Sequence, residues 1–195
     1  MGATAIQGLR DVGGIKAGDK VLIIGASGGI GTLAVQIARD HGAEVTGVCS
    51  TPNVELVRSL GADHVIDYCS DDFTRGKDRY DLVFQLGGMT SPGAIRRVMS
   101  ERGRLVQCAG DGNPWVGPIW NMVKARLTDR FVSQALKLVH TVEDTATLDQ
   151  VRNLIEDGKL KVVVDSTFPF EQAGEAVKLV EEGSPRGKVV ITGVQ

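Results

Sequence analysis

The sequence predicts an α/β protein built on a doubly wound parallel sheet and followed by a C-terminal αβ appendage. Short apolar runs alternate with helical segments along most of the 195 residues, a pattern typical of parallel strands joined by right-handed crossovers. Residues 21–24 form an unbroken run of Val, Leu and Ile, as expected of a strand buried on both faces. A glycine-dense stretch at residues 25–31, the glycine loop, follows this run and leads into a helix. That order indicates a dinucleotide-binding (Rossmann) fold.

The remaining elements follow from apolar periodicity and from the glycine and proline residues between them. We expect helices at residues 2–12, 32–39, 54–60, 92–100, 119–127, 145–157 and 171–182. We expect further strands at residues 44–49, 64–67, 81–85, 103–108, 131–140, 161–164 and 188–192. Gly42 suits the left-handed position after a helix, and Pro52 is placed to open one. Residues 1–160 would form the dinucleotide-binding domain and residues 161–195 a C-terminal segment.

The composition excludes several classes of protein. A formal net charge of −2 and a pI near 5.9 give no electrostatic footprint for nucleic acid. No apolar run approaches the roughly 20 residues of a membrane span and no signal peptide is visible, so we expect a cytoplasmic protein. The three cysteines contain no C-x-x-C pair, and the three histidines share no metal-ligand spacing. We therefore expect reduced thiols and no metal site.

The glycine loop fits two dinucleotide-binding patterns. Counted from Ala26 it is A-x-G-x-x-G, with Gly28 and Gly31 in its second and third glycine positions. Counted from Gly25 it is G-x-x-x-G-x-G, the form used by short-chain dehydrogenases. In either pattern, a turn without Cβ atoms lets the backbone approach a pyrophosphate, and the N–H groups that open the helix hold the anion.

The tyrosines disfavour the short-chain pattern, because those enzymes need Tyr-x-x-x-Lys for proton transfer. Tyr68 and Tyr80 are the only tyrosines, and Asp72 and Phe84 stand four residues after them. No Asn-Ala-Gly follows the fourth strand. The pattern counted from Ala26 is therefore favoured.

Four segments, in matching order and spacing, resemble the zinc-independent quinone oxidoreductase branch of the medium-chain dehydrogenase/reductase superfamily. They are GATAIQGL at residues 2–9, IKAGDKVLIIGASGGIG at 15–31, GADHVIDY at 61–68 and GKVVI at 187–191. Zinc-dependent alcohol dehydrogenases of that superfamily usually carry G-x-G-P-x-G in the loop, so the residues from Ala26 to Gly29 favour the zinc-free branch. The resemblance covers almost the whole chain but only the later part of such an enzyme, and the N-terminal GroES-like catalytic lobe is not matched.

The resemblance also implies roles for two later segments. From about residue 161, the chain is similar to the part of the family that returns to pack on the catalytic lobe. Without that lobe, Phe168, Phe170 and the last strand are expected to leave an apolar patch or an unpaired sheet edge. The strand expected from Phe131 to His140 stands where the superfamily pairs two subunits, which implies a homodimer.

The predicted cofactor residues form three groups. The glycine loop would cradle the phosphates. Residues 48–53, at the end of the second strand, contain no acid that would repel a 2′-phosphate and offer hydroxyl and amide donors to it. By resemblance, Tyr68 would lie beside the adenosine phosphate and Thr4 near the nicotinamide ribose, which the small residues at the later strand ends would also border. The full set is Thr4, Ala26, Ser27, Gly28, Gly29, Ile30, Gly31, Ser50, Thr51, Asn53, Tyr68, Gly87, Ala109 and Gly110.

Several of these residues also fit a purely structural role. Tyr68 equally fits a half-buried aromatic at a strand end, and Thr4 fits a solvent-facing position on its helix. Cys108 lies at the same edge of the sheet but is more typical of a small core cysteine than of a reactive one. Arg186, just before Gly187, is a further candidate contact of the cofactor.

The sequence thus predicts the NADP(H)-binding portion of a zinc-free oxidoreductase, with NAD(H) as the less favoured cofactor. Hydride would pass to quinones or α,β-unsaturated carbonyls, with the cofactor supplying the chemistry. An enoyl reductase of the same superfamily and a non-catalytic NADP(H)-binding module are the alternatives. No residue is assigned as a general acid, because substrate contacts would come largely from the catalytic lobe.

Overall fold

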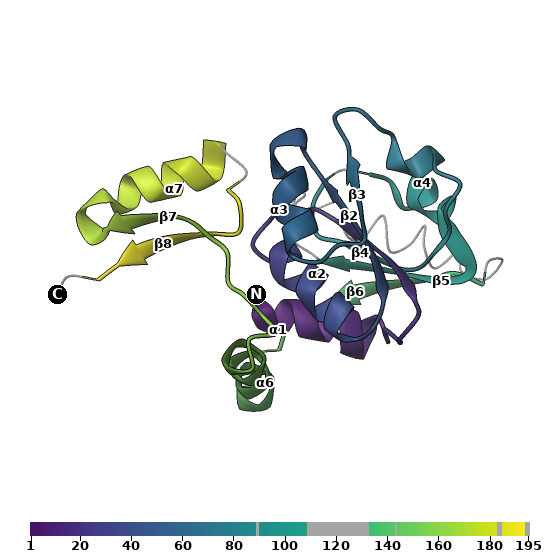
Figure 1. The fold of residues 1–195 in the computed structure, drawn as a ribbon, viewed down its shortest axis with the longest axis horizontal. Coiled ribbons are helices and arrows are strands. Elements are labelled where there is room, and N and C mark those ends of the chain that lie inside the picture. Colours follow the sequence, from purple (N-terminus) through teal and green to yellow (C-terminus); the bar gives the residue numbers. More distant parts are fainter. Residues whose placement is uncertain (89, 109–132, 143, 183–184, 194–195) are drawn as a thin grey trace.

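A computed structural model describes residues 1–88, 90–108, 133–142, 144–182 and 185–193 of the protein. Six parallel strands form one sheet in the order β3-β2-β1-β4-β5-β6 (Figure 1). The strands are β1 Lys20–Ile24, β2 Glu44–Cys49, β3 His64–Asp67, β4 Tyr80–Gln85, β5 Met99–Cys108 and β6 Ala135–Val139. This order is that of a doubly wound dinucleotide-binding fold, and its winding reverses between β1 and β4. The predicted fold class is confirmed.

Apolar side chains of the sheet pack into two cores, one on each face. Val21 and Ile23 point to one core and Leu22 and Ile24 to the other, because successive residues of a strand face opposite ways. The first core is covered by α1 Gly2–Ile6 with its π-helical continuation η1 Gln7–Val12, by α2 Gly31–Asp40 and by α3 Val54–Ser59. The second core is covered by α4 Pro92–Arg96. The sheet is therefore buried on both sides, as the unbroken apolar run of β1 predicts.

The boundary between α4 and β5 differs from the prediction of a helix at 92–100 and a strand at 103–108. The helix ends at Arg96, and β5 begins at Met99, which pairs with Tyr80 across a register shift. Val98 and Met99 are buried in the second core, so they belong to the sheet layer rather than to an exposed helix end. The predicted helix at 119–127 and the first residues of the predicted strand at 131–140 lie outside the described residues.

The predicted C-terminal appendage is present as a parallel strand–helix–strand unit, called the C-terminal unit below. It consists of β7 Val164–Pro169, a 3₁₀ turn η4 Phe170–Gln172, α7 Ala173–Glu182 and β8 Lys188–Thr192. Its strands form a separate two-stranded sheet beside the main body (Figure 1). The strand predicted at 161–164 begins later, as β7 at Val164. The residues before it are held on α2, because the Lys161 backbone is hydrogen-bonded to the Gln36 side chain.

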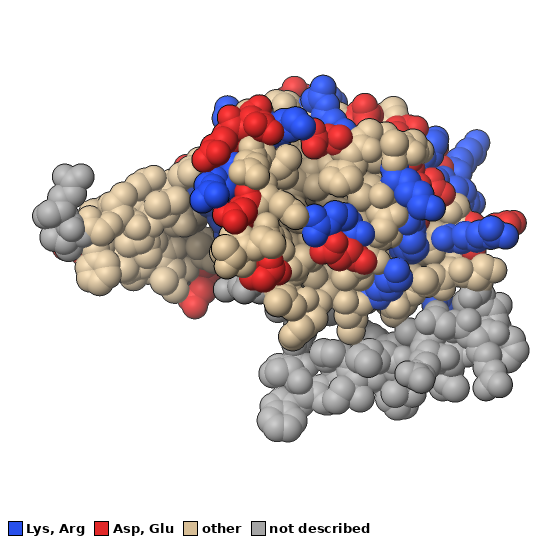
Figure 2. Space-filling model, turned by 90° about the horizontal axis from the view of Figure 1, so that it is seen from below, with Lys and Arg blue, Asp and Glu red and all other residues tan. Residues whose placement is uncertain are grey.

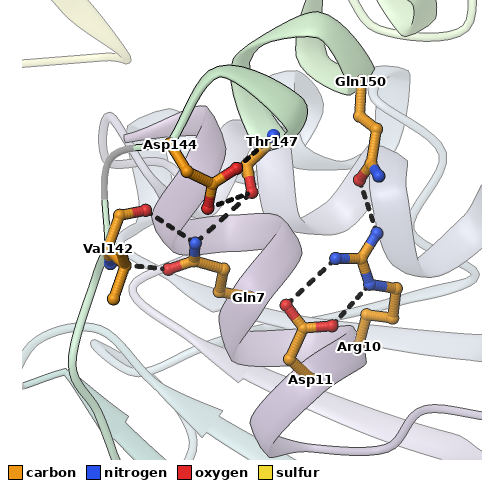
Figure 3. A network of polar contacts seen from close by, with 7 residues as sticks. All are labelled: Gln7, Arg10, Asp11, Val142, Asp144, Thr147 and Gln150. Atoms are coloured by element: carbon orange, nitrogen blue, oxygen red, sulfur yellow. Dashed lines mark hydrogen bonds and ion pairs between the residues drawn. The ribbon is translucent and has the colours of Figure 1, made fainter.

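A polar network attaches helix α6 Thr145–Glu156 to η1 (Figure 3). The buried Gln7 amide donates to the Val142 carbonyl oxygen at 2.7 Å and accepts from the Val142 N–H at 3.0 Å. Asp144 caps α6 by accepting from the Thr147 N–H at 2.7 Å. The start of the chain is thereby fixed at the carboxyl end of β6. Within the described ranges, no helix is long and apolar enough to cross a membrane.

Candidate nucleotide-binding site

The glycine loop joins β1 to α2 at the carboxyl edge of the sheet. A Cβ on Gly31 would lie 2.0 Å from the Gly25 oxygen, so only glycine allows α2 to start so close to the turn. A Cβ on Gly28 would meet only the Gly25 oxygen, at 3.5 Å, and otherwise enters open space. These two roles are the ones expected of the pattern counted from Ala26. Its second glycine, Gly28, leaves room for a pyrophosphate, and its third, Gly31, lets the helix pack closely on the strand.

Backbone donors of the loop are divided between structure and open space. The N–H groups of Gly25 and Ala26 donate to the Val48 oxygen, and that of Gly28 donates to the Gly25 oxygen at 3.2 Å. The N–H groups of Ser27 and Gly29 take no part in these bonds. They stand at the N-terminal end of the buried helix α2, where the helix dipole favours an anion. The residues present therefore fit a pyrophosphate.

An unsatisfied acceptor lies at the predicted nucleotide-selecting end of β2. Asn53 is buried, and its Nδ2 donates to the Ser50 Oγ at 3.0 Å. Its Oδ1 is also buried and has no hydrogen-bond partner within the described part of the chain. Buried polar atoms are normally paired, so this oxygen is an exception at the strand end that the sequence analysis selects.

A carboxylate stands near this end of the sheet, although residues 48–53 contain no acid. Parallel pairing of β2 with β3 brings Asp67 beside Cys49. Hydrogen bonds from the Thr51 side chain and from the Cys69 N–H hold the pKa of the Asp67 carboxyl below its usual range, so it is ionised at neutral pH. The absence of an acid from residues 48–53 therefore does not leave this strand end free of negative charge, because Asp67 of β3 lies next to it. Tyr68 follows Asp67, is 58% exposed and donates its N–H to the Cys49 oxygen.

Two glutamines, which the sequence reasoning did not select, close the ends of β4 and β5. Gln107 Nε2 donates to Gln85 Oε1 at 2.6 Å, and Gln85 Nε2 donates to the Gly88 oxygen at 3.2 Å. Next to them, a Cβ on Gly87 would have no atom within 4 Å, so this strand end is open to a ligand. Burial raises the pKa of the Cys108 thiol to about 11, so it stays protonated at neutral pH and is a poor nucleophile. The predicted contacts Ala109 and Gly110 lie outside the described residues.

Thr4 lies at the carboxyl end of β6, on the same edge of the sheet as the other strand ends. Its hydroxyl accepts from the Thr141 hydroxyl at 3.1 Å, which leaves its own hydrogen free to donate. The Gln7 network holds the helix that carries it (Figure 3). This position is compatible with the contact to a nicotinamide ribose that the resemblance implies.

The segment just before β8 of the C-terminal unit contacts the glycine loop, and the sequence analysis does not predict this contact. The Gly187 N–H donates to the Ser27 oxygen at 3.0 Å. Arg186, the candidate contact before it, is exposed. Within the described ranges, no group of three or more His, Cys, Asp or Glu side chains could hold a metal ion. The arrangement can bind a nucleotide, and no acid or base for catalysis is assigned in it.

Comparisons with known proteins agree with this geometry. Residues 60–191 match a family described as zinc-binding dehydrogenase. The chain is 35% identical over 216 residues to the mitochondrial NAD(P)H oxidoreductase RTN4IP1 of Bos taurus, covering 98% of the chain and 53% of that protein. It is 34% identical over 180 residues to the chloroplastic NADPH-dependent alkenal/one oxidoreductase of Arabidopsis thaliana, covering 90% of the chain and 41% of that protein. The quinone oxidoreductase structure from Coxiella burnetii has a TM-score of 0.85 and 28% identity, covering 100% of the chain and 58% of its own.

These matches have one feature in common. The chain spans about half the length of the curated relatives. The family match takes in well over half of the chain. The matched solved structure has the same fold over the part that corresponds to this chain. The chain therefore belongs to the zinc-binding dehydrogenase family of the medium-chain dehydrogenase/reductase superfamily. It corresponds to the nucleotide-binding portion of these proteins.

Proposed function

We propose that the chain binds NADP(H) as part of an oxidoreductase that reduces quinones or α,β-unsaturated carbonyls. The observation that carries this proposal is the glycine loop, in which Gly31 is closely packed while Gly28 faces open space beside free N–H groups. Two similar proteins, by their names, use NAD(P)H or NADPH, and the second acts on alkenals and enones. The bound nicotinamide would supply the hydride. Gly87, Thr4 and the glutamine pair would border it.

The preference for NADP(H) over NAD(H) is the finer part of this proposal. The Ser50 hydroxyl offers a donor to a 2′-phosphate, while the Thr51 hydroxyl donates to Asp67 and the Asn53 amide donates to Ser50. Tyr68 is exposed. The ionised Asp67 opposes this preference, since it adds negative charge near Thr51. We retain NADP(H) as the proposed cofactor, because residues 48–53 contain no acid and one of the similar proteins is NADPH-dependent by its name. The site residues predicted from the sequence are all kept as proposed contacts.

We propose that the division at residue 160 separates the nucleotide-binding domain from a segment that packs on a catalytic lobe. Large apolar side chains of the C-terminal unit are exposed; they are Val164, Phe170, Val177, Leu179, Val180, Val190 and Ile191. Figure 2 shows interspersed charges over the main body, whereas the face of the C-terminal unit that is turned to the viewer is largely uncharged. Apolar surface of this extent on a small unit is typical of a contact region.

The remaining proposals concern assembly, metal and location. β6 is the last strand of the sheet among the described residues, so its free edge supports a homodimer formed by strand pairing. The sequence of the glycine loop supports a zinc-free enzyme. A cytoplasmic location is proposed from the sequence, although the two similar proteins are mitochondrial and chloroplastic by name.

Titration by fluorescence and steady-state turnover test the function together. We expect NADPH to bind more tightly than NADH, and tighter NADH binding would show that Asp67 dominates the selection. Oxidation of NADPH with a panel of quinones, enones and enoyl thioesters then separates the alternatives. Turnover confined to enoyl thioesters would identify an enoyl reductase, while binding without turnover would support a non-catalytic module or dependence on the catalytic lobe.

A further inference from the structure

The segment that precedes β8 touches the glycine loop at two points. The Gly187 N–H donates to the Ser27 oxygen at 3.0 Å. The Gly187 oxygen lies 3.1 Å from the position that a Cβ on Gly29 would occupy. Gly187 is buried, although the rest of the C-terminal unit is mostly exposed. The contact therefore involves Ser27 and Gly29, two residues whose N–H groups take no part in the bonds of the described residues.

Gly187 occupies a space that accepts no other residue. Its φ of +81° is in the left-handed region, where glycine is favoured. A Cβ at this position would lie 2.4 Å from the Val163 oxygen. That oxygen also accepts from the Lys188 N–H at 2.9 Å, and Val163 itself packs against the first core. The chain is thus fixed between the core and the glycine loop.

The segment that enters β7 is also fixed on this part of the fold. Gln36 is buried in α2, the helix that the glycine loop opens. Its Oε1 accepts from the Lys161 N–H at 2.7 Å, and its Nε2 donates to the Lys161 oxygen at 2.9 Å. Both strands of the C-terminal unit therefore begin from contacts with the glycine loop or with its helix.

The bond to Ser27 fixes the orientation of a single peptide plane. The Ser27 oxygen and the Gly28 N–H belong to the same planar peptide group. The Gly187 N–H holds that oxygen, and the Gly25 oxygen holds that N–H at 3.2 Å. A plane held at both ends needs no further ordering when a ligand arrives, and such preorganisation increases affinity.

We propose that Gly187 is a positioning residue for nucleotide binding: it holds the Ser27–Gly28 peptide and thereby orients the two adjoining peptides, whose Ser27 and Gly29 N–H groups would receive the pyrophosphate. The inference rests on the proposed function, since it assumes that the glycine loop binds the pyrophosphate. It adds that the C-terminal unit contributes to cofactor affinity as well as to contact with a catalytic lobe. By linkage, nucleotide binding must in turn stabilise the contact of Gly187 with the loop.

The test compares Gly187→Ala with Gly158→Ala in the full chain. Gly158 is the matched control, since its φ of +70° is also left-handed but a Cβ there would have no atom within 4 Å. Each variant is titrated with NADPH and with adenosine 2′-monophosphate, which lacks the pyrophosphate. We expect Gly187→Ala to weaken NADPH about tenfold, as for loss of a well-placed hydrogen bond, and to leave adenosine 2′-monophosphate within about twofold. Gly158→Ala should leave both affinities unchanged.

Three outcomes would overturn the inference while leaving the proposed function intact. Gly187→Ala could bind NADPH as the unmodified chain does, it could lose both ligands equally, or Gly158→Ala could lose NADPH to the same extent. Failure of the unmodified chain to bind NADPH would instead overturn the proposed function.

Amide hydrogen exchange of the unmodified chain keeps the proposal testable if Gly187→Ala does not fold. NADPH should slow exchange at Gly187, and adenosine 2′-monophosphate should not. Exchange at Gly187 that is unchanged by saturating NADPH would overturn the inference.

Discussion

The protein contains the same strand–helix–strand arrangement twice, in very different surroundings. In the first, β1 and β2 flank α2, whose residues from Gly31 to Ala38 are all buried. In the second, β7 and β8 flank α7, where Ala176 is the only buried apolar side chain among those described. Both units pair their strands in parallel. The difference lies in what covers them: four further strands and helices on both faces surround the first, whereas the second contacts the body mainly at its strand entrances.

This comparison explains where the binding chemistry lies. A loop can hold its N–H groups in fixed directions only when the strand before it and the helix after it are immobilised by packing. The first unit meets this condition at the glycine loop. The second has the same topology, but its strand β7 ends at Pro169 and is followed by the exposed Phe170, and the described residues form no comparable cradle there. Topology alone therefore does not make a site.

The largest difference between the two units is expected in the free energy of unfolding that is lost when an isoleucine of each is truncated to alanine. Ile23 in β1 is 0% exposed, whereas Ile191 in β8 is 43% exposed. Ile23→Ala should lower the free energy of unfolding by about 2–5 kcal/mol, and Ile191→Ala by less than about 1 kcal/mol. Urea denaturation followed by circular dichroism measures both. Equal costs would mean that the C-terminal unit is packed as firmly as the sheet.

A smaller effect concerns helix α6, which is peripheral but attached by partly buried hydrogen bonds (Figure 3). Gln7→Ala leaves the Val142 N–H and carbonyl without their partner and should cost about 1–3 kcal/mol. The control is Gln150→Ala, because Gln150 is exposed and accepts only from Arg10 among the bonds of this network, so its loss should cost less than about 1 kcal/mol. A Gln7 variant as stable as the Gln150 variant would show that α6 is attached by apolar packing alone.

The sequence was sufficient to predict the features that depend on local pattern. The apolar run of β1, the glycine loop and the order of strands and helices follow from periodicity, and the structure confirms them. Features set by contacts between distant residues were not predictable in this way. Asp67 comes near Thr51 only because β2 and β3 pair, and Gly187 reaches Ser27 across most of the chain. The start of β5 at Met99 also depends on pairing, since residues 99–102 lack a strand-like apolar alternation.

The central claim is that the open space beside Gly28 is the pyrophosphate site. A Cβ at Gly28 makes only one ordinary contact, so Gly28→Ala should leave the unfolding midpoint unchanged. The added methyl group would occupy the space needed by the pyrophosphate, so NADPH affinity should fall by about tenfold or more. Gly93→Ala in α4 is the control, since a Cβ there would have no atom within 4 Å and lies outside the proposed site.

Fluorescence titration of NADPH into the unmodified chain, Gly28→Ala and Gly93→Ala is the most direct measurement. The account predicts that the unmodified chain and Gly93→Ala bind equally and that Gly28→Ala, although folded, binds much more weakly. Equal binding by all three chains, or none by the unmodified chain, would contradict it.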